Sequence, residues 1–114
     1  MMKEEINWHD FEKIDVRIGT IIEVNDFPEA RNAAYQLNID FGEEIGIKKS
    51  SAQITNRYKK EALLGKQIIA VVNFPKKQIA NFMSECLVLG IVGNDKDVVL
   101  LSPDFPIKNG SKMA

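Results

Sequence analysis

The segment from Asp15 to Phe27 constrains the fold most, because it combines unusual length with a high density of strand-forming residues. Six of its side chains are β-branched: Val16, Ile18, Thr20, Ile21, Ile22 and Val24. Such side chains favour extended backbone. Gly19 lies near the middle, where a strand of a small barrel bends or carries a bulge. A long strand interrupted in this way predicts a curved sheet.

Further segments have strand character. Residues 34–41 alternate between apolar and polar side chains, residues 45–51 form a third strand, and residues 87–92 and 98–101 form a closing hairpin across residues 93–97. Residues 66–74 are a nearly continuous apolar run that ends at Pro75. Such a run predicts a strand covered on both faces, by the core and by a partner subunit, so we expect a homodimer.

Two short helices complete the prediction. Residues 6–12 can form one helix capped by Asn7, and residues 56–64 can form another that stops at Gly65. The second helix falls between the third and fourth strands. The predicted class is therefore all-β with short helices, as a five-stranded OB-fold barrel.

The length of 114 residues, 45% of them hydrophobic, suits one domain spanning residues 1–114. No window contains the roughly 18 consecutive apolar residues of a membrane span, and the start lacks the apolar stretch of a signal peptide. We therefore expect a cytoplasmic protein.

The sequence contains few residues that could form a catalytic site or a metal site. His9 is the only histidine and Cys86 the only cysteine, so we expect no zinc site of the usual ligand set, and no Cys–His pairing is present in the sequence. Cys86 lies in an apolar run that favours burial, and no glycine-rich phosphate loop occurs. The sequence favours a binding protein over an enzyme, with no cofactor and no metal.

The charges are unevenly distributed, although the net charge is only −1. Residues 48–77 contain eight basic side chains and one acidic side chain, whereas residues 1–47 contain eleven acidic and four basic ones. Polar and aromatic residues alternate with the basic ones, a mixture that nucleic-acid-binding barrels use. A basic segment of this kind points to an anionic partner, and ordinary solvated charges around a barrel are the alternative.

An apolar segment follows the basic one, from Phe74 to Met83. Ile79, Phe82 and Met83 within it are large enough to line a peptide-binding groove if they are exposed. Packing beneath the mouth of the barrel is the alternative.

Several motifs in order resemble one known family. Residues Phe11 to Ile21 are similar to the opening motif of the tRNA-binding domains that occur as appendages of methionyl- and phenylalanyl-tRNA synthetases and as free-standing proteins. Residues 27–31, 40–42, 47–55, 71–75 and 84–90 resemble most closely the free-standing, secretion-associated chaperones of that family. Asn81 stands where the synthetase-type pattern commonly has Gly, and Cys86-Leu87 where it has Gly-Met, which favours the chaperone branch.

The resemblance implies an OB-fold homodimer with terminal segments in the subunit interface and two candidate surfaces. The nucleic-acid-binding surface would include Arg31, Lys48, Lys49, Arg57, Asn73, Lys76, Lys77 and Ser84. The peptide-binding pocket would be lined by Phe74, Ile79 and Phe82, to which the apolar segment adds Met83. We thus expect a dimeric chaperone-like protein for unfolded or exported polypeptides, with a tRNA-binding protein acting in trans or as an aminoacylation cofactor as the alternative.

Overall fold

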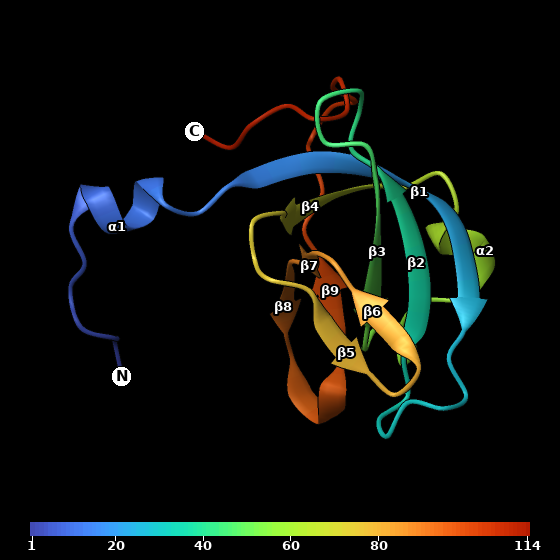
Figure 1. The fold of residues 1–114 in the computed structure, drawn as a ribbon. Coiled ribbons are helices and arrows are strands. Elements are labelled where there is room, and N and C mark those ends of the chain that lie inside the picture. The colour runs from blue at the N-terminus through green and yellow to red at the C-terminus, as the bar shows by residue number, and fades with distance from the viewer.

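A computed structural model describes all 114 residues and shows a nearly closed, five-stranded barrel (Figure 1). The sheet has the order β3-β2-β1-β4-β7 and every pairing is antiparallel. The strands are β1 (Val16–Asp26), β2 (Tyr35–Asp40), β3 (Ile47–Ala52), β4 (Gln67–Val71) and β7 (Leu87–Val88). The predicted OB-like barrel is confirmed.

Strand β1 is the organising strand, because its two halves pair with different neighbours. Residues 16–20 pair with β4 and residues 20–26 pair with β2, with a register shift between Ile21 and Glu23. The expected irregularity therefore lies a few residues beyond Gly19. Gly19 has another role, because a Cβ atom there would lie 2.6 Å from Ile39 Cγ2 and 2.7 Å from the Phe41 ring.

This close approach gives a stability prediction. Gly19→Val should lower the free energy of unfolding by about 3 kcal/mol, because a well-packed core cannot accept the added atoms without displacing Phe41. Urea denaturation of the variant measures the effect. Gly46→Val is the control, because no atom lies within 4 Å of its added Cβ; however, its positive φ of 84° adds backbone strain. A Gly19→Val loss no larger than that of Gly46→Val would contradict the packing argument.

The gap between β3 and β7 is closed mainly by side chains and by the segment that precedes β7. The Glu85 N–H donates to the Lys49 carbonyl at 2.7 Å, and the buried Ser50 hydroxyl donates to the Cys86 carbonyl at 2.9 Å. The barrel interior is filled by side chains of low exposure, among them Ile21, Leu37, Ile39, Phe41, Leu63 and Ile68. A second, smaller cluster contains Phe27, Ala34 and Phe82.

Both predicted helices form, and one is shorter than expected. Helix α1 (Trp8–Glu12) has the expected Asn7 cap, completed by the Asp10 side chain in a capping box. Helix α2 (Lys60–Leu63) is a single turn that ends before Gly65, which has a φ of 86°. Residues 56–59 are not helical, and the side chains of Asn56 and Arg57 bond to Asp95 and Asp97. Neither helix is long and apolar enough to cross a membrane.

The region after β4 is more divided than predicted. Strands β5 (Lys77–Ile79) and β6 (Phe82–Ser84) form a hairpin that the sequence analysis did not anticipate. The expected hairpin forms from β8 (Gly90–Val92) and β9 (Val98–Leu100), joined by the 3-10 turn η1 (Asn94–Lys96). The predicted strand over 87–92 is interrupted at Leu89, because β7 pairs with β4 and β8 pairs with β9. The C-terminal tail returns to β1, where the Met113 N–H donates to the Val16 carbonyl.

Candidate polypeptide and nucleic-acid interface

A groove of about 980 Å³ opens on the surface of the barrel. Its walls come from the β5–β6 and β8–β9 hairpins, β7, the end of β3 and the loops around residues 30–34 and 74–75. Twelve of its 21 lining residues are hydrophobic, so apolar contact dominates its chemistry. These twelve are Ala30, Ala34, Ala52, Ile54, Phe74, Ile79, Cys86, Leu87, Val88, Val92, Val98 and Leu100.

The residues expected to bind peptides divide between the groove and the core. Phe74 lines the groove with 54% of its surface exposed, and the half-buried Ile79 lines it as well. Phe82 is only 8% exposed and packs against Phe27, with ring centroids 5.4 Å apart. Met83 is exposed and is not part of the groove lining. Phe82 thus belongs to the smaller core cluster, while Phe74 and Ile79 line the groove.

Most of the basic residues expected to bind nucleic acid gather beside the groove, and we call Arg31, Lys48, Lys49, Lys76 and Lys77 the basic rim. Arg31 and Lys77 line the groove itself, together with Ser84, which pairs with Lys77 across the β5–β6 hairpin. The Lys49 ammonium lies 5.4 Å from the centre of the Phe82 ring, a distance typical of a cation–π contact. The charge of Lys48 acts on nearby Glu85 and Cys86.

Glu85 is the one acidic side chain among these cations. One of its carboxylate oxygens accepts from the Lys49 N–H at 2.9 Å, and the other lies 3.4 Å from Lys76 Nζ. Burial by itself raises the pKa of Glu85, but the Lys49 N–H and the Lys76 ammonium outweigh it and hold that pKa below its ordinary value. Glu85 is therefore charged at neutral pH and compensates Lys76.

Two residues of the expected nucleic-acid surface have other partners. Arg57 forms a bidentate ion pair with Asp97, each bond 2.7 Å long, which raises the pKa of Arg57 and lowers that of Asp97. The Asn73 side chain accepts from the Asp15 N–H at 3.0 Å and donates to the Lys13 carbonyl at 2.7 Å. Asn73 thus fixes the start of β1 to the loop that carries Phe74.

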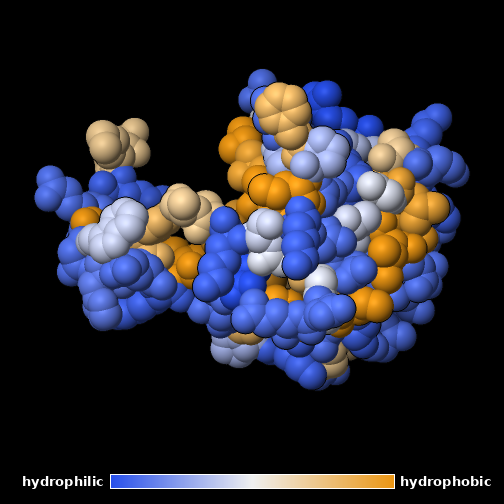
Figure 2. Space-filling model, turned by 90° about the horizontal axis from the view of Figure 1, so that it is seen from above, coloured by the Kyte–Doolittle hydropathy of each residue, from blue (hydrophilic) through white to orange (hydrophobic).

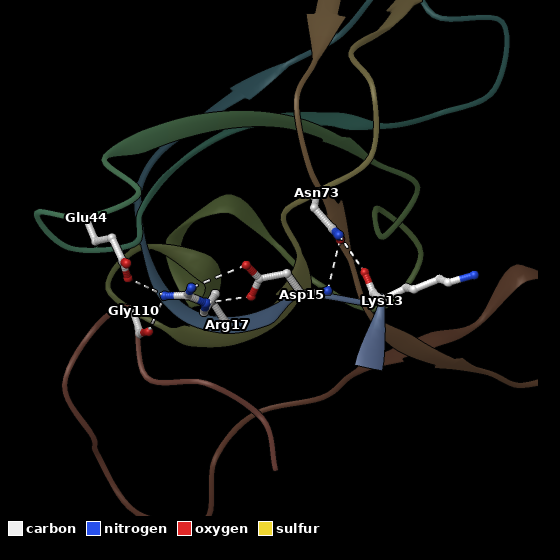
Figure 3. Close-up of polar contacts among 6 residues, drawn as sticks. All are labelled: Lys13, Asp15, Arg17, Glu44, Asn73 and Gly110. Carbon is white, nitrogen blue, oxygen red and sulfur yellow. Dashed lines mark hydrogen bonds and ion pairs between the residues drawn. The ribbon is translucent and has the colours of Figure 1, made fainter. Parts of the chain in front are cut away.

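A buried arginine continues this anchoring network (Figure 3). Arg17 is 6% exposed and bonds to Asp15 at 2.6 Å, to Glu44 at 2.8 Å and to the Gly110 carbonyl at 3.1 Å. Its carboxylate partners, Asp15 first and then Glu44, raise the pKa of Arg17, and Arg17 in turn lowers the pKa of Glu44. One guanidinium therefore links β1, the turn before β3 and the C-terminal tail.

Residues 1–14, which we call the N-terminal arm, extend away from the barrel (Figure 1). The arm exposes large apolar side chains, namely Met1, Met2, Ile6, Trp8 and Ile14, and its helix α1 buries no residue. In the space-filling view the arm forms a separate lobe at the left, with apolar surface facing the indentation between the lobe and the barrel (Figure 2). Such a surface without a covering element marks an interaction site.

The cysteine behaves as a core residue, as the sequence predicted. Cys86 is 6% exposed and belongs to the barrel core. Burial raises the pKa of its thiol to about 12, so the thiol stays protonated and unreactive at neutral pH.

Comparison with known proteins places these features in a family. Residues 16–112 match the family described as "Putative tRNA binding domain". The chain belongs to this tRNA-binding domain family, as the sequence motifs indicated. The description of this family names the binding of tRNA.

Within the family, the resemblance to chaperones is confirmed by two solved structures. The chaperone CsaA from Bacillus anthracis is 53% identical, with a TM-score of 0.92, and the alignment covers 97% of this chain and all of that one. The CsaA chaperone protein from Picrophilus torridus is 58% identical, with a TM-score of 0.91, over 96% of this chain and all of that one.

Methionine–tRNA ligases match as well, over a small part of their length. The ligase of Nanoarchaeum equitans is 36% identical over 108 residues, which are 95% of this chain and 13% of the ligase. This chain therefore corresponds to one segment of a much longer enzyme.

Parts of the site were missed by the sequence analysis. The walls contributed by Leu87, Val88, Val98 and Leu100 were interpreted only as a closing hairpin, and their apolar pattern does not reveal which faces stay uncovered. The Arg17 network was not anticipated either. Its only local signal was that Asp15 and Arg17, which carry opposite charges, lie two residues apart.

Proposed function

We propose that this chain is a dimeric chaperone-like protein that binds extended apolar segments of unfolded or exported polypeptides in the groove. The carrying observation is the exposed apolar lining of the groove, in particular Phe74, Leu87 and Val92, which are all more than 45% exposed. Exposed apolar surface in a concave site is stabilised when a ligand covers it. The high identity to the CsaA chaperones supports the same proposal.

The strand edges beside the groove suit an extended chain. Strand β5 pairs only with β6, so the backbone groups on its other edge have no strand partner. A polypeptide can add to such an edge through main-chain hydrogen bonds while its side chains enter apolar pockets. This mode accepts many sequences, as a chaperone requires.

The N-terminal arm supports a dimer. Its large apolar side chains Ile6 and Trp8 are 66% and 67% exposed, and the Trp8 ring lies 5.2 Å from the Phe11 ring. A second copy would cover this surface, and the Asn73 and Arg17 contacts hold the root of the arm in a fixed position for it. Two grooves on one dimer would also increase avidity for a long client.

Aggregation of a chemically denatured client tests the polypeptide function. Light scattering after dilution of the client from urea should fall as the purified protein is added, and should approach its minimum near one dimer per client. If light scattering in the absence of RNA does not change when the protein is added, the proposal is contradicted.

The alternative is a tRNA-binding function, and one observation favours it. Lys48 and Lys49 are next to each other on β3, form no ion pair, and lie outside the groove lining in a domain of the tRNA-binding family. Phosphate contacts need only such unpaired cations near the nucleic-acid backbone.

The salt dependence of tRNA affinity tests this alternative. In a log–log plot of tRNA affinity against salt concentration, each phosphate contact contributes about 1 to the magnitude of the slope. Lys48→Gln/Lys49→Gln should therefore reduce that magnitude by about 2. Filter binding at several salt concentrations measures it. The control is Lys59→Gln/Lys66→Gln, which removes the same charge elsewhere. An unchanged slope, or an equal change in the control, would overturn the role of the two lysines.

A further inference from the structure

The charge around the groove is one-sided. Two cations, Arg31 and Lys77, line the groove, and no acidic side chain does. Both cations are exposed, and neither forms an ion pair with another side chain. The apolar groove thus carries two positive charges that form no ion pair within the chain.

Neither Glu29, two residues before Arg31, nor Glu85, which follows the β5–β6 hairpin, forms an ion pair with these two cations. Glu85 is committed through both carboxylate oxygens, to the Lys49 N–H and to the Lys76 ammonium. The only other acidic residue between positions 48 and 94 is Glu61, which lies in helix α2 and not in the groove lining. The charge of Arg31 and Lys77 is therefore available to a ligand.

We propose that the groove selects apolar polypeptide segments that carry a carboxylate, and discriminates against segments flanked by lysine or arginine. The carboxylate can belong to an Asp or Glu side chain or to a C-terminus, since both offer the planar group that Arg31 can bind with two parallel hydrogen bonds. A lysine at the same place would meet two like charges, whose repulsion disfavours binding. This inference rests on the proposed polypeptide function and specifies its substrate class.

Fluorescence anisotropy with labelled peptides tests the inference on the full-length protein after nuclease treatment. Four peptides share one apolar ten-residue core and differ at their ends. Three have an amidated C-terminus and are flanked by two Asp, two Asn or two Lys residues. The fourth is flanked by two Asn residues and has a free C-terminal carboxylate. The matched variants are Arg31→Gln/Lys77→Gln and the control Lys59→Gln/Lys66→Gln, whose lysines do not line the groove.

We expect the Asp peptide to bind about ten-fold more tightly than the Lys peptide, since each exposed ion pair contributes a few-fold and each like-charge contact removes a similar factor. Arg31→Gln/Lys77→Gln should abolish this difference, and the control should retain it. Added salt should reduce it as well. If the free-carboxylate peptide binds as tightly as the Asp peptide or more tightly, a chain terminus is identified as the source of the carboxylate. That result would support the inference.

Three results would overturn the inference, and they separate it from the proposed function. If the neutral, acidic and basic peptides bind equally well, the groove has no charge preference, and the polypeptide function is unaffected. A charge preference that survives in Arg31→Gln/Lys77→Gln would mean that other residues produce it. If that variant loses affinity for tRNA while its peptide affinities stay the same, the two cations serve nucleic acid instead. If none of the four peptides binds, the proposed polypeptide function itself is wrong.

Discussion

Phe74→Ser/Leu87→Ser is expected to weaken binding of an unfolded polypeptide by about thirty-fold and to leave the barrel folded. Both side chains line the groove and are about half exposed, so little of the core depends on them. A bound segment would cover their exposed halves, and the area lost from that contact corresponds to about 2 kcal/mol of binding free energy, or about thirty-fold in affinity. Anisotropy of a labelled, permanently unfolded client measures the change.

The matched control is Ile47→Ser/Leu64→Ser. These two side chains are 60% and 59% exposed, and neither lines the groove. The control removes a similar exposed apolar area, so it should bind the client as the unaltered protein does. Circular dichroism and urea denaturation establish that both variants fold. An equal loss of affinity in the two variants would show that general surface hydrophobicity, and not the groove, holds the client.

Trp8→Ser/Ile14→Ser is expected to convert a dimer into a monomer. The two side chains are 67% and 45% exposed on the N-terminal arm and have no covering element within the chain. Their burial against a second copy would contribute about 3 kcal/mol or more, so their removal should raise the dissociation constant of the dimer by at least about a hundred-fold. Light scattering coupled to size exclusion should give 12.9 kDa for the variant and twice that mass for the unaltered chain.

The control on the same helix is His9→Ser, since His9 is exposed and polar. This variant should keep the dimer mass. Trp8 is the only tryptophan, so its emission should also shift to the red when the unaltered protein is diluted below the dissociation constant. An unaltered chain that stays at 12.9 kDa at high concentration would contradict the dimer.

Elements determined by local pattern were predictable from the sequence. The β-branched run of β1 and the Asn7 cap of α1 are formed by neighbours in the chain, so their signals survive folding. Helix α2 was overestimated, because residues 56–59 have helix-forming side chains but no helical backbone; Arg57 there pairs with Asp97, forty residues away. The β5–β6 hairpin was missed because strands of three residues that begin with Lys77 and Gln78 leave no periodicity to detect.

The candidate site depends on exposure, which a sequence pattern does not contain. Phe74 and Phe82 lie eight residues apart and look equivalent in the sequence, yet one faces the groove and the other packs against Phe27. Asn73 is expected on the nucleic-acid surface from its position in a motif, and its bonds to Asp15 and Lys13 are not visible in the sequence. In each case a distant partner decides the orientation of the side chain.

Amide chemical-shift mapping by NMR tests the central claim, that the groove is where this protein binds polypeptide, most directly. The labelled protein would be titrated with an unfolded client free of nucleic acid. The account predicts that the largest shifts fall on groove residues such as Ile79, Leu87 and Val98, while Ile47 and Leu64 on other parts of the surface stay unchanged. Shifts confined to residues outside the groove lining would contradict it.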